Sequence, residues 1–279
     1  MNLNLSASVN VFRLLARPAL CLPHGVVPTF NDIPIPLDSA FATRAGGRKP
    51  DIRAVVLDKD DCFAYPESSQ VYPDYEERFK KLREAYPGRK LLIVSNTAGA
   101  LSYDKDRKLQ ADVEAGTGVT VLPHATKKPG CGDEIMEYFR AHPETGVTAP
   151  HQIAVVGDRL TTDMMLANSM GSWGLWVREG VVPPEKKSVF SRWERKLADA
   201  LTARGYEAPL PESPFDVDDR LDAPAAQSQH AENVLHTPTH RHHRPGRSSP
   251  SYSSRRELGP WPDACNNCPV HKLGWRYRT

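Results

Sequence analysis

The chain has 279 residues, of which 39% are hydrophobic, enough to bury one sizeable core with residues left over. Its 36 basic and 34 acidic residues nearly balance, which excludes a general electrostatic attraction to nucleic acid. No apolar run reaches the roughly 18 to 20 residues of a membrane-spanning helix, and the five scattered cysteines do not form a disulfide framework, which favours a reducing compartment.

The first 37 residues form a basic N-terminal segment, because two arginines occur there and no acid precedes Asp32. Leu5, Val9 and Phe12 would share one face if this segment were helical. Such beginnings are typical of mitochondrial transit peptides and of helices that lie on a membrane surface. We therefore expect residues 1–37 to target or associate with a membrane, with a frayed terminus as the alternative.

Residues 38–205 alternate between short apolar runs and helical stretches. The runs have the length of buried strands and lie at 54–57, 91–95, 119–122, 153–157 and 174–177. The helical stretches lie at 72–84, 106–115, 131–140 and 163–170. This alternation predicts a Rossmann-like α/β domain whose parallel sheet has about five strands flanked by helices. Right-handed crossovers would bring the carboxyl ends of all strands to one edge.

A final amphipathic helix follows the last expected strand. Phe190, Trp193, Leu197 and Leu201 recur every three or four residues, with basic residues around them. We expect this apolar stripe to pack on the sheet, and the alternative is that its basic flank faces anionic lipid headgroups. Residues 206–279 are rich in Pro, Ser, His and Arg and lack apolar periodicity, so we expect a disordered basic tail.

Polar residues follow four of the five expected strands, at the edge where a parallel sheet presents its ligand site. In chain order they are Asp58, Asp60, Ser95, Asn96, Lys127, Lys128, Asp158 and Asp163. Each alone could be a helix cap or a turn residue. Together they supply carboxylates, a hydroxyl group, an amide and an amine at one place, which favours phosphoryl transfer.

Two carboxylates one residue apart suit the hydrolysis of a phosphate ester. Asp58 would attack phosphorus and form an aspartyl-phosphate. Asp60 would protonate the leaving alkoxide and then take a proton from the attacking water. Ser95 and Asn96 are expected to bind phosphoryl oxygens.

A phosphate dianion repels a carboxylate, so this chemistry also needs positive charge. Lys127 or Lys128 would neutralise the transferring group, and Asp163 would support the site. Mg²⁺, a hard cation that prefers oxygen ligands, would be held by Asp58, Asp60 and Asp158, with Asp60 contributing a backbone carbonyl.

At these positions the chain resembles the haloacid dehalogenase superfamily of phosphatases in all four of its motifs. Residues 58–62 stand for the pattern Asp-x-Asp-x-Thr/Val and depart from it only at Cys62, and Ser95, Lys128 and the run from Gly157-Asp158 to Asp163 supply the rest. In the superfamily the lysine usually stands directly before a proline, and Lys128 stands directly before Pro129. Each interval between motifs holds one helix and its loops, so we expect no large cap domain and a cleft open to bulky substrates.

A closer resemblance is to the fungal mitochondrial phosphatidylglycerophosphate phosphatases, over about residues 14–201. It is carried by residues 27–34, 57–62, 93–99, 126–131 and 155–160. It implies Mg²⁺-dependent hydrolysis of phosphatidylglycerophosphate to phosphatidylglycerol, the precursor of cardiolipin, by a peripheral protein on the matrix side of the mitochondrial inner membrane. The expected partners are a phospholipid substrate and an anionic membrane surface, without nucleic acid, and the oligomeric state stays open.

Two other functions fit the same motifs. A soluble phosphatase of this superfamily could act on a phosphoprotein or a small phosphate ester. A non-catalytic membrane adaptor could keep the scaffold, although such a protein would have no need of the acid/base Asp60.

Overall fold

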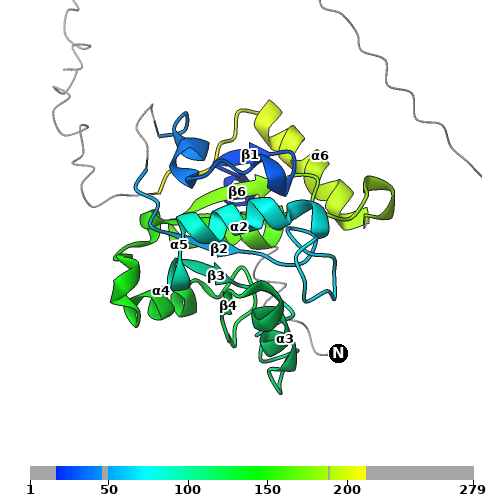
Figure 1. The fold of residues 1–279 in the computed structure, drawn as a ribbon. Coiled ribbons are helices and arrows are strands. Elements are labelled where there is room, and N and C mark those ends of the chain that lie inside the picture. The colour runs from blue at the N-terminus through cyan, green and yellow to red at the C-terminus, as the bar shows by residue number, and fades with distance from the viewer. Residues whose placement is uncertain (1–16, 46–49, 188, 212–279) are drawn as a thin grey trace, which may run out of the picture. The chain divides into compact units, whose positions relative to one another are not determined.

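The computed structural model describes residues 17–45, 50–187 and 189–211. They contain a six-stranded parallel sheet in the order β1-β6-β5-β2-β3-β4, flanked by helices (Figure 1). The strands are β1 (Gly25–Val27), β2 (Ala54–Leu57), β3 (Leu91–Ile93), β4 (Thr120–Val121), β5 (Ile153–Gly157) and β6 (Trp173–Val177). The α-helices are α2 (Glu76–Ala85), α3 (Lys108–Thr117), α4 (Gly132–Arg140), α5 (Met165–Met170) and α6 (Val189–Ala203). The predicted α/β class and parallel sheet are confirmed.

Strand β2 lies at the centre of the sheet and is buried on both faces. Val55 and Leu57 pack into one core with side chains of α2 and α3, whereas Ala54 and Val56 pack into a second core with side chains of α4 and α5. A central parallel strand needs apolar residues at every position for this reason. The continuous apolar run 54–57 in the sequence is therefore the signature of this strand.

The register of the central strands decides which residues reach the carboxyl edge. Leu57 pairs with Ile93 of β3 on one side and with Val156 of β5 on the other. Three segments follow these paired residues and therefore leave the sheet side by side: residues 58, 94–97 and 157–158.

The first strand differs from the sequence-based prediction. Residues 25–27 form β1, which pairs with β6 at the edge of the sheet, and Phe30, Ile33 and Leu37 are fully buried in the main core. Residues 17–37 are thus part of the α/β domain rather than a segment before it, and the sheet has six strands instead of about five. A strand of three residues is too short to show a pattern in the sequence. Residues 1–16, where the predicted membrane-associating face lies, are outside the described residues.

The tail begins later than the predicted residue 206. Arg44 pairs with the Glu207 carboxylate and donates to the Ala208 carbonyl, and His24 Nε2 lies 2.7 Å from the Pro209 carbonyl oxygen. Residues 206–211 are therefore attached to the domain, and the tail 212–279 lies outside the described residues. No described helix is long and apolar enough to cross a bilayer.

Helix α6 forms as predicted, but its apolar stripe is only partly covered. Leu201 is 6% exposed and Leu197 packs against the same cluster, whereas Phe190 is 49% and Trp193 45% exposed. The expectation that the whole stripe packs on the sheet is therefore wrong for the first turns of the helix.

Candidate active site

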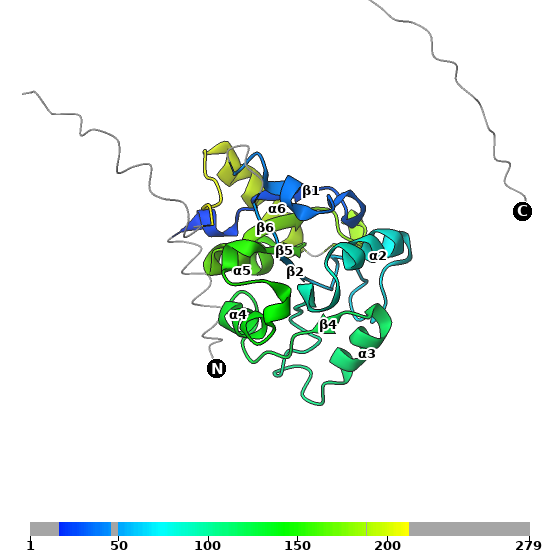
Figure 2. The ribbon, with the colours of Figure 1, turned by 60° about the vertical axis from the view of Figure 1, so that its left-hand side comes forward.

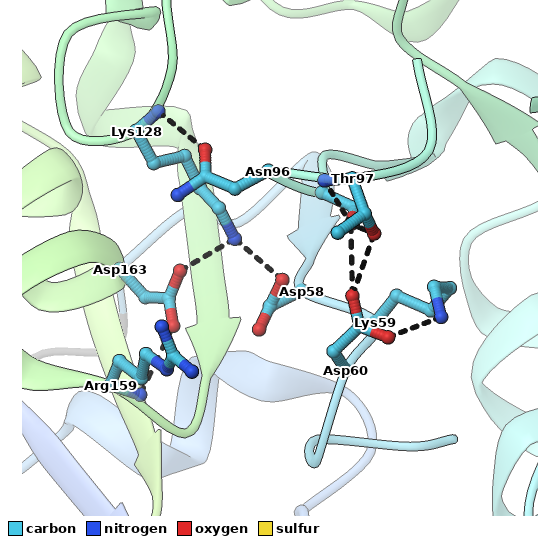
Figure 3. A network of polar contacts seen from close by, with 9 residues as sticks. Asp58, Lys59, Asp60, Asn96, Thr97, Lys128, Arg159 and Asp163 are labelled. Atoms are coloured by element: carbon cyan, nitrogen blue, oxygen red, sulfur yellow. Dashed lines mark hydrogen bonds and ion pairs between the residues drawn. The ribbon is translucent and has the colours of Figure 1, made fainter. Parts of the chain in front are cut away.

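A buried lysine joins two carboxylates at the carboxyl edge of the sheet. Lys128 Nζ donates to Asp58 Oδ1 at 2.6 Å and to Asp163 Oδ1 at 2.7 Å (Figure 3). Burial alone would lower the pKa of Lys128, but the two carboxylates outweigh it and raise that pKa above its ordinary value. Lys128 is therefore a permanent positive charge beside Asp58.

The sheet and one side-chain hydrogen bond position this pair. The backbone N–H of Asp58 donates to the Val156 carbonyl at 2.8 Å, so the β-ladder extends to the first residue of the site. Asn96 Oδ1 accepts the backbone N–H of Lys128 at 2.8 Å and fixes the loop that carries the lysine (Figure 3). The Asn96 amide oxygen is thus engaged with the backbone, which leaves its NH₂ group as the donor for a ligand.

Asp60, the second of the two carboxylates that follow β2, has partners on both carboxylate oxygens. Oδ1 forms an ion pair with Lys59, and Oδ2 accepts Thr97 Oγ1 at 2.8 Å and Ser95 Oγ at 3.3 Å. Lys59 is itself held by the Ser68 carbonyl at 2.9 Å. Lys59 and Thr97 were not among the predicted site residues, although each lies within two positions of one.

Three carboxylates gather close enough to share a cation. One oxygen each of Asp58, Asp158 and Asp163 lies within 4.8 Å of the others. Asp158 Oδ1 is buried without a hydrogen-bond partner among the described residues, and burial together with Asp58 and Asp163 raises the pKa of Asp158 well above its usual range. Burial also raises the pKa of Asp163 to about 6, against the opposing effect of Lys128.

These features fit a hard divalent cation. One lysine cannot neutralise three carboxylates, and the unpartnered oxygen of Asp158 is an open ligand position. The Asp60 side chain is not in this group, because Lys59 and Thr97 hold it, so its share in a metal site would be through the backbone carbonyl. Asp163, predicted as a supporting residue, lies within the group.

A glycine makes room for this arrangement. A Cβ atom on Gly157 would lie 2.3 Å from Asp163 Oδ2, so no side chain fits there. The same carboxylate oxygen accepts the backbone N–H of Arg159 at 3.1 Å. The spacing from Gly157 to Asp163 therefore reflects a tight turn that folds Asp163 back onto the end of β5.

The structure brings most of the predicted residues together and separates one. Those at the carboxyl edge are Asp58, Asp60, Ser95, Asn96, Lys128, Asp158 and Asp163. Lys127 is exposed, with its Nζ 5.9 Å from the centre of the Tyr103 ring. The choice between Lys127 and Lys128 is thus decided by geometry, because Lys128 alone turns inward. Between successive strands from β2 to β5 the chain forms one α-helix and short turns, so the predicted lack of a large cap is confirmed.

Comparison with known proteins adds independent information. The sequence profile of the family described as mitochondrial PGP phosphatase matches residues 5–182. The chain is 46% identical over 199 residues to the mitochondrial phosphatidylglycerophosphatase of Saccharomyces cerevisiae, covering 71% of this chain and 99% of that protein. It is 31% identical over 181 residues to the "probable" mitochondrial phosphatidylglycerophosphatase of Schizosaccharomyces pombe, covering 65% of this chain and 85% of that protein. A chloroplastic phosphatidylglycerophosphate phosphatase of Chlamydomonas reinhardtii is 36% identical over 168 residues, which are 60% of this chain and 56% of that protein.

Proposed function

The chain belongs to the mitochondrial PGP phosphatase family, and we propose that it is a Mg²⁺-dependent phosphatidylglycerophosphatase that releases the terminal phosphate of phosphatidylglycerophosphate. The observation that carries the proposal is the contact of Lys128 with both Asp58 and Asp163 beside the unpartnered oxygen of Asp158. The four motifs and the parallel sheet support membership of the haloacid dehalogenase superfamily, whose phosphatases use this set of groups.

The two halves of the reaction fall to Asp58 and Asp60. Asp58, held in place by Lys128, attacks phosphorus, so that a P–O bond forms to its carboxylate as the bond to the lipid glycerol oxygen breaks. Asp60, in its protonated form, gives its proton to that leaving oxygen. It then accepts a proton from the water that hydrolyses the aspartyl-phosphate. Thr97 orients Asp60 through its hydroxyl group.

Positive charge is the other requirement. Lys128 supplies one charge, and Asp58, Asp158, Asp163 and the Asp60 carbonyl would hold Mg²⁺. When bound, the ion supplies the charge that offsets the repulsion between a carboxylate nucleophile and a phosphate dianion. Ser95 and Asn96 donate to the phosphoryl oxygens.

The uncapped carboxyl edge supports a lipid substrate. Without a cap, nothing in the described domain encloses a small molecule, and a headgroup at a bilayer surface can approach the carboxyl edge directly. We place the protein peripherally on the matrix side of the mitochondrial inner membrane, where phosphatidylglycerol serves cardiolipin synthesis. The basic N-terminal segment remains a predicted targeting or membrane-associating element.

The test is phosphate release by the purified full chain from vesicles containing phosphatidylglycerophosphate, with Mg²⁺ and with a chelator. We expect turnover that the chelator stops and Mg²⁺ restores. Faster turnover of phosphopeptides, nucleotides or small esters would favour the soluble phosphatase instead. The absence of turnover on every substrate with Mg²⁺ present would favour the non-catalytic adaptor.

A further inference from the structure

An exposed apolar patch begins helix α6. It consists of Val189, Phe190 and Trp193, which are 74%, 49% and 45% exposed, and the rings of Phe190 and Trp193 lie 5.6 Å apart. Side chains of this size and apolarity are rarely grouped on a surface without a partner. We call these three residues the α6 patch.

The helix that carries the α6 patch is hydrogen-bonded to a segment of the candidate active site. Glu194, one helical turn after Phe190 and 2% exposed, accepts the backbone N–H of Thr161 at 2.9 Å and its hydroxyl at 2.5 Å. Thr161 lies in the turn between Asp158 and Asp163. The turn of α6 that carries the patch is therefore attached to the segment between Asp158 and Asp163.

The loop that leads into α6 is attached to the nucleophile loop as well. Asp61, which follows Asp60, accepts the backbone N–H of Val182 at 2.5 Å and Lys187 Nζ at 2.6 Å. Tyr75 donates to the Gly180 carbonyl at 3.1 Å. These contacts hold the start of α6 at the carboxyl edge, so the α6 patch and the candidate catalytic residues share one side of the domain.

Positive charge surrounds the α6 patch. Lys186, Arg192 and Lys196 are exposed, and none of them pairs with an acid among the residues that the structure describes. Glu194 is buried and Lys187 is neutralised by Asp61, so the exposed Glu185 is the acid that faces these three cations, and the exposed charge of residues 185–196 is positive. Aromatic side chains bordered by Lys and Arg on one helix are typical of elements that lie in the interface of an anionic bilayer.

A second group of exposed side chains, which we call the Tyr103 rim, lies on the other side of the catalytic residues from the α6 patch and consists of Leu101, Tyr103 and Lys127. Tyr103 is 61% and Leu101 38% exposed, on the loop after β3, and Lys127 stands over the Tyr103 ring from the loop after β4. The strand order puts β6 on one side of β5 and β2, and β3 and β4 on the other. In both views α6 lies by β1 and β6, whereas α3 lies by β4 (Figure 1, Figure 2). The α6 patch and the Tyr103 rim therefore flank the catalytic residues.

We propose that the α6 patch inserts into the surface of an anionic bilayer and, with the Tyr103 rim, holds the carboxyl edge of the sheet over a lipid headgroup. This inference rests on the proposed function and names the surface by which that site meets its substrate. A second copy of this chain is a poorer occupant, because a two-fold contact through the patch would bring Lys186, Arg192 and Lys196 close to their own counterparts.

The test uses two double variants of the full chain. The patch variant carries Phe190→Ser and Trp193→Ser, and the matched pair carries Tyr206→Ser and Leu210→Ser. The matched pair lies after the other end of α6 and is 43% and 53% exposed. Flotation with vesicles of phosphatidylcholine plus phosphatidylglycerol measures binding without any turnover. We expect the patch variant to lose about tenfold or more in vesicle partitioning, because two large aromatic groups no longer insert, and the matched pair to behave as wild type.

A charge variant tests the second part of the surface. Lys186→Gln, Arg192→Gln and Lys196→Gln together should reduce binding to the anionic vesicles by about tenfold or more and leave weak binding to pure phosphatidylcholine unchanged. All variants should unfold at the wild-type temperature. Activity on p-nitrophenyl phosphate should be unchanged in the patch variant, while activity on vesicle-borne phosphatidylglycerophosphate falls with the loss of binding.

Three outcomes would overturn the inference. Equal vesicle binding by wild type and patch variant would remove the role of the patch. So would an equal loss in the patch variant and the matched pair. Concentration-dependent self-association of the wild type that the patch variant loses, with vesicle binding kept, would assign the surface to a contact between copies. A wild type that binds vesicles but hydrolyses no phosphate ester would contradict the proposed function and leave the docking surface standing.

Discussion

Lys128 Nζ lies 2.6 Å from Asp58 Oδ1, although 70 positions separate the two residues in the chain. The lysine reaches the aspartate because its loop follows β4 and the aspartate follows β2, and both strands end at the same edge. The contact gives the proposed nucleophile a fixed orientation and a neighbouring positive charge. The consequences can be measured residue by residue.

Replacing the nucleophile should abolish turnover and spare the fold. In Asp58→Asn the carboxamide cannot attack phosphorus, so phosphate release should fall by at least about a thousandfold. Lys128 keeps its contact with Asp163 at 2.7 Å, so the variant should remain folded by circular dichroism. Asp112→Asn, at an exposed position on α3, is the control and should keep full activity. Near-normal phosphate release by Asp58→Asn would refute the assignment.

The two adjacent lysines should differ sharply. Lys128→Met removes the cation that donates to both Asp58 and Asp163, and breaking a buried ion pair from one side costs about 3–5 kcal/mol. Lys127→Met removes an exposed charge and should change the free energy of unfolding by no more than about 0.5 kcal/mol. Urea unfolding in a chelating buffer measures both. Similar losses for the two variants would show that Lys128 is not the buried partner of the acids.

Metal binding should appear as a gain in stability that depends on Asp158. A ligand at about 100 times its dissociation constant stabilises the folded state by about 2.7 kcal/mol, so Mg²⁺ should raise the thermal midpoint of the wild type. Asp158→Asn should lose that response, and its midpoint in chelator should not fall, because burial, Asp58 and Asp163 already disfavour a charge on this side chain when no cation is bound. A full Mg²⁺ response in Asp158→Asn would exclude this carboxylate from the metal site.

His24 should make the domain sensitive to mild acid. The backbone N–H of Gly174 donates to Nδ1 at 2.9 Å, so that nitrogen carries no proton, and Nε2 donates to the Pro209 carbonyl. Burial lowers the pKa of His24 from 6.5 to about 4, and Arg44 adds to this effect. Between these pH values the unfolded chain binds a proton at His24 that the folded chain does not, so stability is lost as the pH falls.

The loss assigned to His24 should reach about 3 kcal/mol at pH 4 and vanish above pH 7. The measurement is the free energy of unfolding against pH for the wild type and for His24→Gln, which cannot take up a proton. Carboxylates contribute equally to both curves, so the difference between them isolates the histidine. Parallel curves from pH 7 to pH 4 would show that His24 is not held neutral by the fold.

Much of the fold and of the candidate site could be predicted from the sequence because the information is local. The run 54–57 is apolar at every position, and a parallel strand buried on both faces requires that. Once such strands are recognised, the rules of parallel sheets place Asp58, Ser95 and Asp158 at one edge without any knowledge of side-chain packing.

The remaining features depend on which surfaces meet. β1 has three residues and is stabilised by pairing with β6, a contact that no pattern within residues 25–27 reveals. Lys127 and Lys128 are the same residue type at adjacent positions, and the resemblance favours Lys128, but only the path of their loop turns it inward. Periodicity puts Phe190 and Leu201 on one stripe of α6, yet the neighbouring surface covers only the later turns of the helix. The sequence by itself thus determined the sheet and the reactive groups at its edge, whereas the tertiary structure decided their partners and what stays exposed, because burial depends on contacts between segments far apart in the chain.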